Sequence, residues 1–102
     1  MDRWIQQFLL HLRAERNASP HTLRAYQREL KSYLVFLNKK YPQVSLDRSH
    51  RLIIRDYLAQ LQERPLQRAS VLRGIAVLRA FYKYLLREEA VSQNPFVNLS
   101  LL

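Results

Sequence analysis

The residues best suited to bind a ligand are the arginines of segment 68–82, which are interspersed with small residues. In a helix with about 100° between successive residues, the apolar side chains cluster near Ile75 and Arg73 points nearly opposite. The neighbours of Arg73 on that side are short: Ala69, Ala76, Val77 and Ala80. This pattern suits a helix that approaches a DNA groove, because arginine forms paired hydrogen bonds with guanine or phosphate.

The other two arginines of this segment are placed differently. Arg68 and Arg79 lie nearer the apolar edge, where they border the core or contact phosphate. The alternative is that Arg73 is only a solvated surface residue.

The segment that follows Asn17 and Ala18 carries a second face of this kind. Opposite its leucine and tyrosine stripe lie short and cationic side chains: His21, Arg24, Ala25 and Arg28. Ser19 is a preferred helix cap, and Pro20 suits the first helical position because an N–H there has no intrahelical partner. The free N–H groups at this helix start, with Ser19, His21 and Thr22, favour a phosphate. Equally, Ser19 could serve only as a cap and Thr22 only as a helix-start residue.

Patterns typical of catalysis or metal binding are weak. The eight carboxylates are scattered, the three histidines lie on separate segments, and there is no cysteine. A single glycine excludes a glycine-rich phosphate loop. We therefore expect no metal, no cofactor and no catalytic residue. Tyr82 and Tyr84 raise the question of a covalent nucleophile in a DNA-binding chain. We exclude that role, because Tyr82 is predicted to face inward and no basic cluster surrounds either tyrosine in the sequence.

Composition favours a single all-α domain. The chain has 102 residues with one glycine and four prolines, and helix-forming residues dominate. Its 17 Lys and Arg exceed 8 Asp and Glu, giving a formal net charge of +9. That excess favours nucleic acid as the partner over an anionic membrane surface, for which no continuous lysine-rich amphipathic face exists. The apolar runs are too short to span a membrane and the start lacks a signal-peptide layout. We therefore expect a cytoplasmic location and a monomeric isolated domain.

Apolar periodicity and helix-end signals predict four helices, over about residues 3–16, 20–38, 47–64 and 66–89. The third is predicted to begin at an N-cap of Asp47 or Ser49, with Leu52 on its apolar side. Gly74 costs about 1 kcal/mol relative to alanine inside a helix, which indicates close approach by another helix or a ligand backbone. The periodic pattern ends at Asn94-Pro95. We expect a domain over residues 1–95 and the start of a linker over residues 96–102.

Two stretches carry a resemblance to a known family. They are residues 17–30 (NASPHTLRAYQREL) and residues 70–85 (SVLRGIAVLRAFYKYL), followed by Asn94-Pro95. In order and spacing they resemble the N-terminal core-binding (SAM-like) domain of tyrosine recombinases, the phage integrase and Xer class. The resemblance covers about Ile5 to Pro95. The sequence departs from the family pattern at Gly74, where a bulkier residue is more usual, and this affects only the expected local packing.

The resemblance implies a compact SAM-like bundle of four to five helices that clamps a recombination half-site. In that family the second and fourth helices enter adjacent parts of the major groove. The DNA-binding residues implied here are Ser19, His21, Thr22, Arg24, Arg28, Arg68, Ser70 and Arg73. Strand cleavage in the family belongs to a separate C-terminal domain. The resemblance therefore implies a non-catalytic module for DNA integration or recombination, linked to an absent catalytic domain, with other recombinase subunits as partners of the full-length protein.

Two other functions stay open at this point. A stand-alone helix-turn-helix regulator needs two short helices joined by a turn of about three or four residues, and the long connection at 39–46 speaks against it. A helical adaptor for an acidic protein would expose an apolar patch, for which Val35 and Val77 are the available residues.

Overall fold

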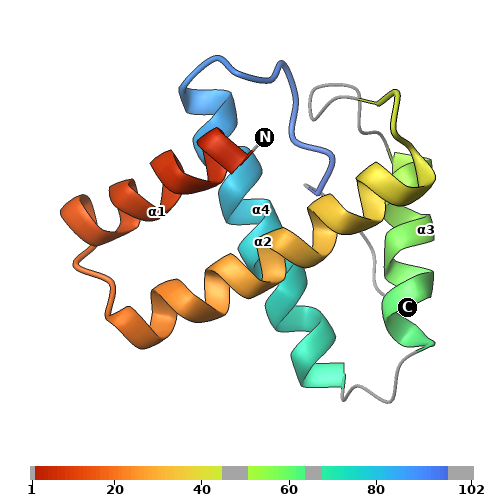
Figure 1. Ribbon diagram of the computed structural model, residues 1–102, viewed down its shortest axis with the longest axis horizontal. Coiled ribbons are helices and arrows are strands. Elements are labelled where there is room, and N and C mark those ends of the chain that lie inside the picture. The colour runs from red at the N-terminus through yellow and green to blue at the C-terminus, as the bar shows by residue number, and fades with distance from the viewer. Residues whose placement is uncertain (1, 45–50, 64–67, 97–102) are drawn as a thin grey trace.

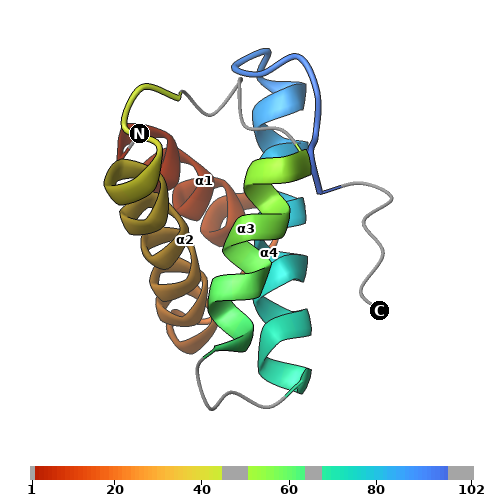
Figure 2. The ribbon, with the colours of Figure 1, turned by 90° about the vertical axis from the view of Figure 1, so that its right-hand side faces the viewer.

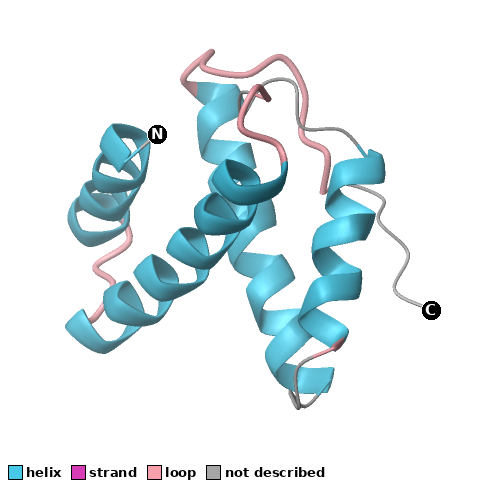
Figure 3. Ribbon diagram, turned by 45° about the vertical axis from the view of Figure 1, so that its right-hand side comes forward, coloured by secondary structure: helices cyan, strands magenta, loops and turns pink. Residues whose placement is uncertain are grey.

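Four helices form in the segments where apolar periodicity predicts them. The computed structural model describes residues 2–44, 51–63 and 68–96. Its helices are α1 (Asp2–Glu15), α2 (Pro20–Lys40), α3 (Arg51–Gln62) and α4 (Arg68–Arg87). Within these described ranges there is no strand (Figure 3), which confirms the predicted all-α class. The predicted N-cap of the third helix, Asp47 or Ser49, lies outside the described residues.

Local sequence determines the break between α1 and α2. Asn17 adopts a φ of 52°, in the left-handed region that asparagine tolerates better than most residues. Ser19 is then extended, and its side-chain oxygen accepts a hydrogen bond from the backbone N–H of Thr22 at 3.1 Å. Pro20 occupies the first helical position. The predicted cap of α2 is therefore confirmed.

Helix α2 crosses α4, and the other two helices flank this crossing (Figure 1). Helix α1 packs against both α2 and α4, while α3 packs against α4. Helices α3 and α4 run antiparallel (Figure 2). After α4 the chain turns back over the helix end and descends on the side of α3 (Figures 1 and 3). The α2–α4 crossing is thus covered from several directions.

Aromatic side chains fill the centre of the crossing. Tyr33 of α2 and Tyr82 of α4 are fully buried, and their hydroxyl oxygens lie 3.2 Å apart. The ring of Tyr57 meets Tyr33 edge-on at 5.2 Å between centroids, and its hydroxyl donates to Ser32 Oγ at 3.1 Å. A buried tyrosine needs a hydrogen-bond partner for its hydroxyl, so these pairs keep polar atoms satisfied inside the core. The prediction that Tyr82 faces inward is confirmed.

Phe96 closes the core from outside the helices. It is fully buried, and its ring centroid lies 5.8 Å from that of Tyr33 and 5.4 Å from that of Tyr82. Arg79 Nε donates to the Phe96 carbonyl at 3.0 Å, and the side chain of Asn94 bonds both the Arg79 carbonyl at 3.2 Å and the Phe96 N–H at 3.0 Å. We call residues 94–96 the strap. Residue 96 thus belongs to the core and not to the linker expected from that position, because a lone aromatic outside a periodic segment gives no sequence signal of burial.

Two apolar residues lie on the side opposite to their prediction. Leu52 is 69% exposed, because the buried residues of α3 from Ile53 to Leu61 centre on the other side of the helix. Val77, predicted beside Arg73 on the outer face, is only 3% exposed. The buried face of α4 is wide because α1, α2 and α3 all contact that helix, and it reaches round to Val77.

Gly74 of α4 faces a side chain of α2. It is buried, and a Cβ at this position would lie 2.8 Å from Glu29 Oε2. That distance is below van der Waals contact, so any larger residue requires the Glu29 side chain to move. The close neighbour at Gly74 is thus a side chain of another helix and not the backbone of that helix.

Replacing Phe96 with alanine tests whether the strap is part of the core. We expect Phe96→Ala to lower the free energy of unfolding by about 3–5 kcal/mol, because it leaves a cavity between two buried tyrosines. The exposed Leu52→Ala is the matched control and should change it by about 0.5 kcal/mol or less. Urea unfolding measures both, and equal effects would show that residue 96 does not contribute to the core.

The contact between Gly74 and Glu29 predicts coupled mutations. In a Glu29→Ala background, Gly74→Ala should stabilise the chain by about 1 kcal/mol, the gain expected from helix propensity alone. In the native background the gain should be smaller, because the new methyl group displaces the carboxylate. A double-mutant cycle by urea unfolding measures the difference. Identical effects in the two backgrounds would contradict this account of the crossing.

Candidate nucleic-acid interface

The predicted residues at the start of α2 form a small hydrogen-bonded group. Besides accepting the Thr22 N–H, Ser19 Oγ donates to Thr22 Oγ1 at 3.1 Å. His21 is exposed beside them. Ser19 therefore has a capping role that needs no ligand, while the exposed helix start leaves backbone N–H groups and positive dipole directed outward.

The two predicted arginines of α2 lie further along its exposed side. Arg24 and Arg28 are both exposed. Arg28 also lines an open groove between α2 and α3, which the sequence did not predict. The groove residues are Arg28, Lys31, Ser32, Val35, Phe36, Lys39, Lys40, Gln60 and Glu63. Four of these nine carry positive charge against one carboxylate, so the groove is basic.

Part of the positive charge in this groove is compensated. Lys40 Nζ lies 3.6 Å from a carboxylate oxygen of Asp56 and 5.8 Å from the centre of the Phe36 ring. Tyr41 donates a hydrogen bond to the same carboxylate at 2.6 Å. This bond stabilises the protonated phenol and raises the pKa of Tyr41, with smaller contributions from burial and from the Asp56 charge. The Lys40 end of the groove is therefore a structural anchor between α2 and α3.

The predicted residues on α4 gather at its start. Arg68 is the first residue of α4 and is exposed. Arg73 is exposed, as predicted, and its Nη2 donates to Ser70 Oγ at 3.2 Å, one turn back along the helix. The Arg73 side chain is therefore held along the α4 surface rather than free in solvent.

The α2–α4 contact relates the two groups to each other. Arg28 directly precedes Glu29, and Arg73 directly precedes Gly74, the two residues that meet at the crossing. Each arginine therefore lies about 100° round its helix from the contact. Within the first group Ser19 bonds Thr22, and within the second Arg73 bonds Ser70.

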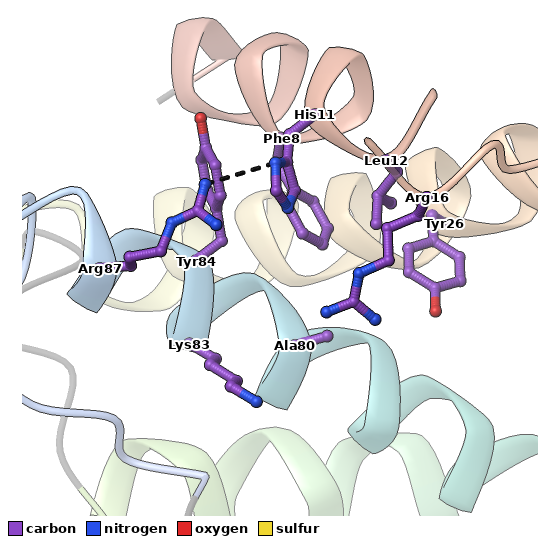
Figure 4. A pocket seen from close by; sticks show the side chains of 9 residues that line it. All are labelled: Phe8, His11, Leu12, Arg16, Tyr26, Ala80, Lys83, Tyr84 and Arg87. Carbon is purple, nitrogen blue, oxygen red and sulfur yellow. Dashed lines mark hydrogen bonds between the residues drawn. The ribbon is translucent and has the colours of Figure 1, made fainter. Parts of the chain in front are cut away.

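A second pocket, which the sequence did not predict, lies between α1, α2 and α4 (Figure 4). It has a volume of about 210 Å³ and is lined by Phe8, His11, Leu12, Arg16, Tyr26, Ala80, Lys83, Tyr84 and Arg87. We call it the α1–α4 pocket. Its residues come from three helices, so no single stretch of sequence gives a signal for it.

Tyr84, considered above as a nucleophile, forms one wall of this pocket. Its ring lies 5.0 Å from that of His11, and the Arg87 guanidinium lies 5.5 Å from its ring centre. His11, which is distant in the sequence, thus lies beside Tyr84 together with Arg87 of the same helix. Burial, followed by the charge of Glu88, raises the pKa of the Tyr84 hydroxyl. A raised pKa opposes the ionised form that a nucleophile needs.

Acidic side chains compensate only some of the basic residues that line the α1–α4 pocket. Glu15 Oε2 lies 3.1 Å from His11 Nδ1 and 3.9 Å from Arg87 Nη1, and Glu88 lies 3.5 Å from Arg87 Nε. Arg16 and Lys83 also line the pocket, and neither of these two carboxylates forms an ion pair with them. The described part of the chain holds no group of three or more potential metal ligands. None of its helices is long and apolar enough to cross a bilayer.

Comparison with known proteins now identifies the fold. Residues 5–89 match the family model described as "Phage integrase, N-terminal SAM-like domain". The chain belongs to this family. The match covers α1, α2, α3 and α4, so every helix described above is part of the phage integrase SAM-like domain.

The relatives are bacterial recombinases. A protein named tyrosine recombinase XerC from Listeria welshimeri is 40% identical over 99 residues, which cover 93% of this chain and 31% of the relative. XerC from Halalkalibacterium halodurans is 36% identical over 96 residues, covering 94% of this chain and 31% of the relative. XerC from Pelotomaculum thermopropionicum is 39% identical, and the match covers 33% of that relative. The SAM-like chain thus spans about a third of these relatives. No solved structure matches it.

The capping role of Ser19 gives a test that separates stability from ligand binding. Ser19→Ala should lower the free energy of unfolding by about 1 kcal/mol, because the Thr22 N–H loses its acceptor. Ser19→Asp keeps an acceptor and should stay within a few tenths of a kcal/mol of the native chain. Thermal or urea unfolding measures both. Equal loss in the two variants would contradict the capping role.

Proposed function

We propose that this chain is the DNA-binding module of a site-specific tyrosine recombinase, and that it holds a recombination half-site through α2 and α4. In the longer protein it acts beside a catalytic domain and other recombinase subunits. The chain itself is non-catalytic and supplies affinity and orientation for DNA integration or recombination.

The observation that carries this proposal is the α2–α4 crossing. The contact between Glu29 and Gly74 brings the two helices together at the residues next to Arg28 and Arg73. Each helix therefore contributes an exposed arginine near one junction, on a chain of formal net charge +9. Positive side chains near one another on a rigid scaffold attract the phosphates of a duplex, and a guanidinium can also bind a base edge.

The proposed contact residues divide by chemistry. Ser19, His21 and Thr22 offer the start of α2 to a phosphate, and Arg24 and Arg28 extend that contact along the helix. On α4, Ser70 orients Arg73 towards a base or phosphate, while Arg68 contacts the backbone. The alternative of an adaptor for an acidic protein loses one of its two predicted residues, because Val77 is 3% exposed while Val35 is 60% exposed.

Binding of duplex DNA at several salt concentrations tests the proposal. If the module neutralises four to six phosphates, the logarithm of its affinity should fall against the logarithm of salt concentration with a slope of roughly −4 to −5. An amide-shift titration at two salt concentrations should show perturbations concentrated in residues 19–28 and 68–76. Absence of binding, or shifts spread evenly over the chain, would overturn the proposal.

Arg73→Ala then separates base reading from phosphate contact. If Arg73 binds a base, the variant should lose about 1–3 kcal/mol of binding free energy on the cognate site and less on other duplexes. An equal loss on all sequences assigns it to phosphate. Arg55→Ala, which removes one exposed cation from α3, is the matched control for net charge and should have a smaller effect on both.

A further inference from the structure

We infer that the α1–α4 pocket is a phosphate-binding site, formed by Arg16, Tyr26 and Lys83, that holds one phosphodiester of the DNA backbone. For the source of that phosphate, the inference rests on the proposed DNA-binding function. The pocket lies apart from the residues that the sequence singled out, and it adds α1 to the contact surface.

The first argument is the convergence of donors. Arg16 follows the end of α1, Tyr26 belongs to α2 and Lys83 belongs to α4, yet all three line the same cavity. In Figure 4 the Arg16 side chain lies above Ala80, with Tyr26 on one side of it and Lys83 on the other. Guanidinium, phenol and ammonium groups all donate hydrogen bonds, which is the set a phosphate with its acceptor oxygens requires.

The second argument is the lack of a counter-charge for Arg16 and Lys83. The nearby carboxylates, Glu15 and Glu88, form their ion pairs with His11 and Arg87 instead. Within the residues that the structure describes, the side-chain polar groups of Arg16, Tyr26 and Lys83 have no hydrogen-bond or ion-pair partner. Two like charges that line one cavity without an intervening anion repel each other. A bound anion offsets this repulsion because it attracts both cations.

The third argument is the shape and position of the site. Leu12 and Ala80 give the cavity apolar walls, suited to the deoxyribose that accompanies a backbone phosphate. Ala80 and Arg73 are seven residues apart on α4, which is about 10.5 Å along the helix axis at a rise of 1.5 Å per residue. They lie on the same side of α4, since seven residues are close to two turns. A strand that passes Arg73 can therefore reach the pocket along one side of the helix.

The test compares two double variants of the whole 102-residue chain. Arg16→Gln with Lys83→Gln removes the two cations of the pocket. Arg13→Gln with Arg55→Gln removes two exposed cations that line neither the pocket nor the α2–α3 groove. Both changes lower the net charge equally. Thermal unfolding confirms that each variant folds before it is used.

The first measurement is a titration with inorganic phosphate at constant ionic strength, followed by amide shifts. We expect saturable shifts at Ala80 and Lys83 in the native chain and in the control, and loss of saturation in the pocket variant. The second measurement is the salt dependence of duplex binding. The slope should become less steep by about 1 in the pocket variant relative to the control, the value for one phosphate.

The outcomes separate this inference from the proposed function. If the pocket variant behaves like the control in both titrations, the inference is overturned even if the native chain binds DNA. If phosphate shifts depend on the pocket while no variant binds DNA, the proposed function fails and the site takes a free phosphate. If those shifts depend on the pocket but the salt slope does not, the assignment to the DNA backbone is overturned.

Discussion

The crossing of α2 over α4 is the constraint on which the rest of the molecule depends. It is held at the centre by the hydroxyls of Tyr33 and Tyr82, 3.2 Å apart in a fully buried site. A hydrogen bond between buried hydroxyls depends on their geometry, so separation of the helices would break this one. Gly74 leaves room for the Glu29 side chain on the same pair of helices. The angle between the two helices therefore sets where α1 and α3 can pack and where the exposed arginines lie.

The sequence predicted the helices and their local ends well because the signals for both are local. Ser19 and Pro20 specify the start of α2 within a few residues, and no distant contact is needed to see it. Leu52 was assigned to the apolar side of α3 because it is apolar. At 100° per residue it lies opposite the other apolar residues of that helix, so its position round the helix should have decided the prediction. Val77 shows a different limit. How far burial extends round α4 depends on how many helices contact it, which one helix cannot reveal.

The residues of the candidate site also fall into those that local sequence predicts and those that only the packing of the helices brings together. Exposed cations such as Arg24, Arg28 and Arg73 were predicted from their position opposite an apolar stripe. The hydrogen bond from Arg73 to Ser70 has the spacing of one helical turn and was within reach of the sequence. The α1–α4 pocket was not, because Arg16 and Lys83 are 67 positions apart (83 − 16) and become neighbours only when three helices pack. The contact between Tyr84 and His11 likewise arises only when α1 packs on α4.

The strap, residues 94–96, connects the last described residues to the aromatic centre of the core. The Phe96 ring packs against Tyr33 and Tyr82, and Arg79 donates a hydrogen bond to the Phe96 carbonyl. A force that pulls on the chain at residue 96 would thus act first on the packing of Phe96 against Tyr33 and Tyr82. It would not act first on the last turn of α4. Dislodging Phe96 admits water to the paired hydroxyls, so mechanical release and loss of cooperative folding should occur as one event. The position of residue 96 is therefore set by the core itself.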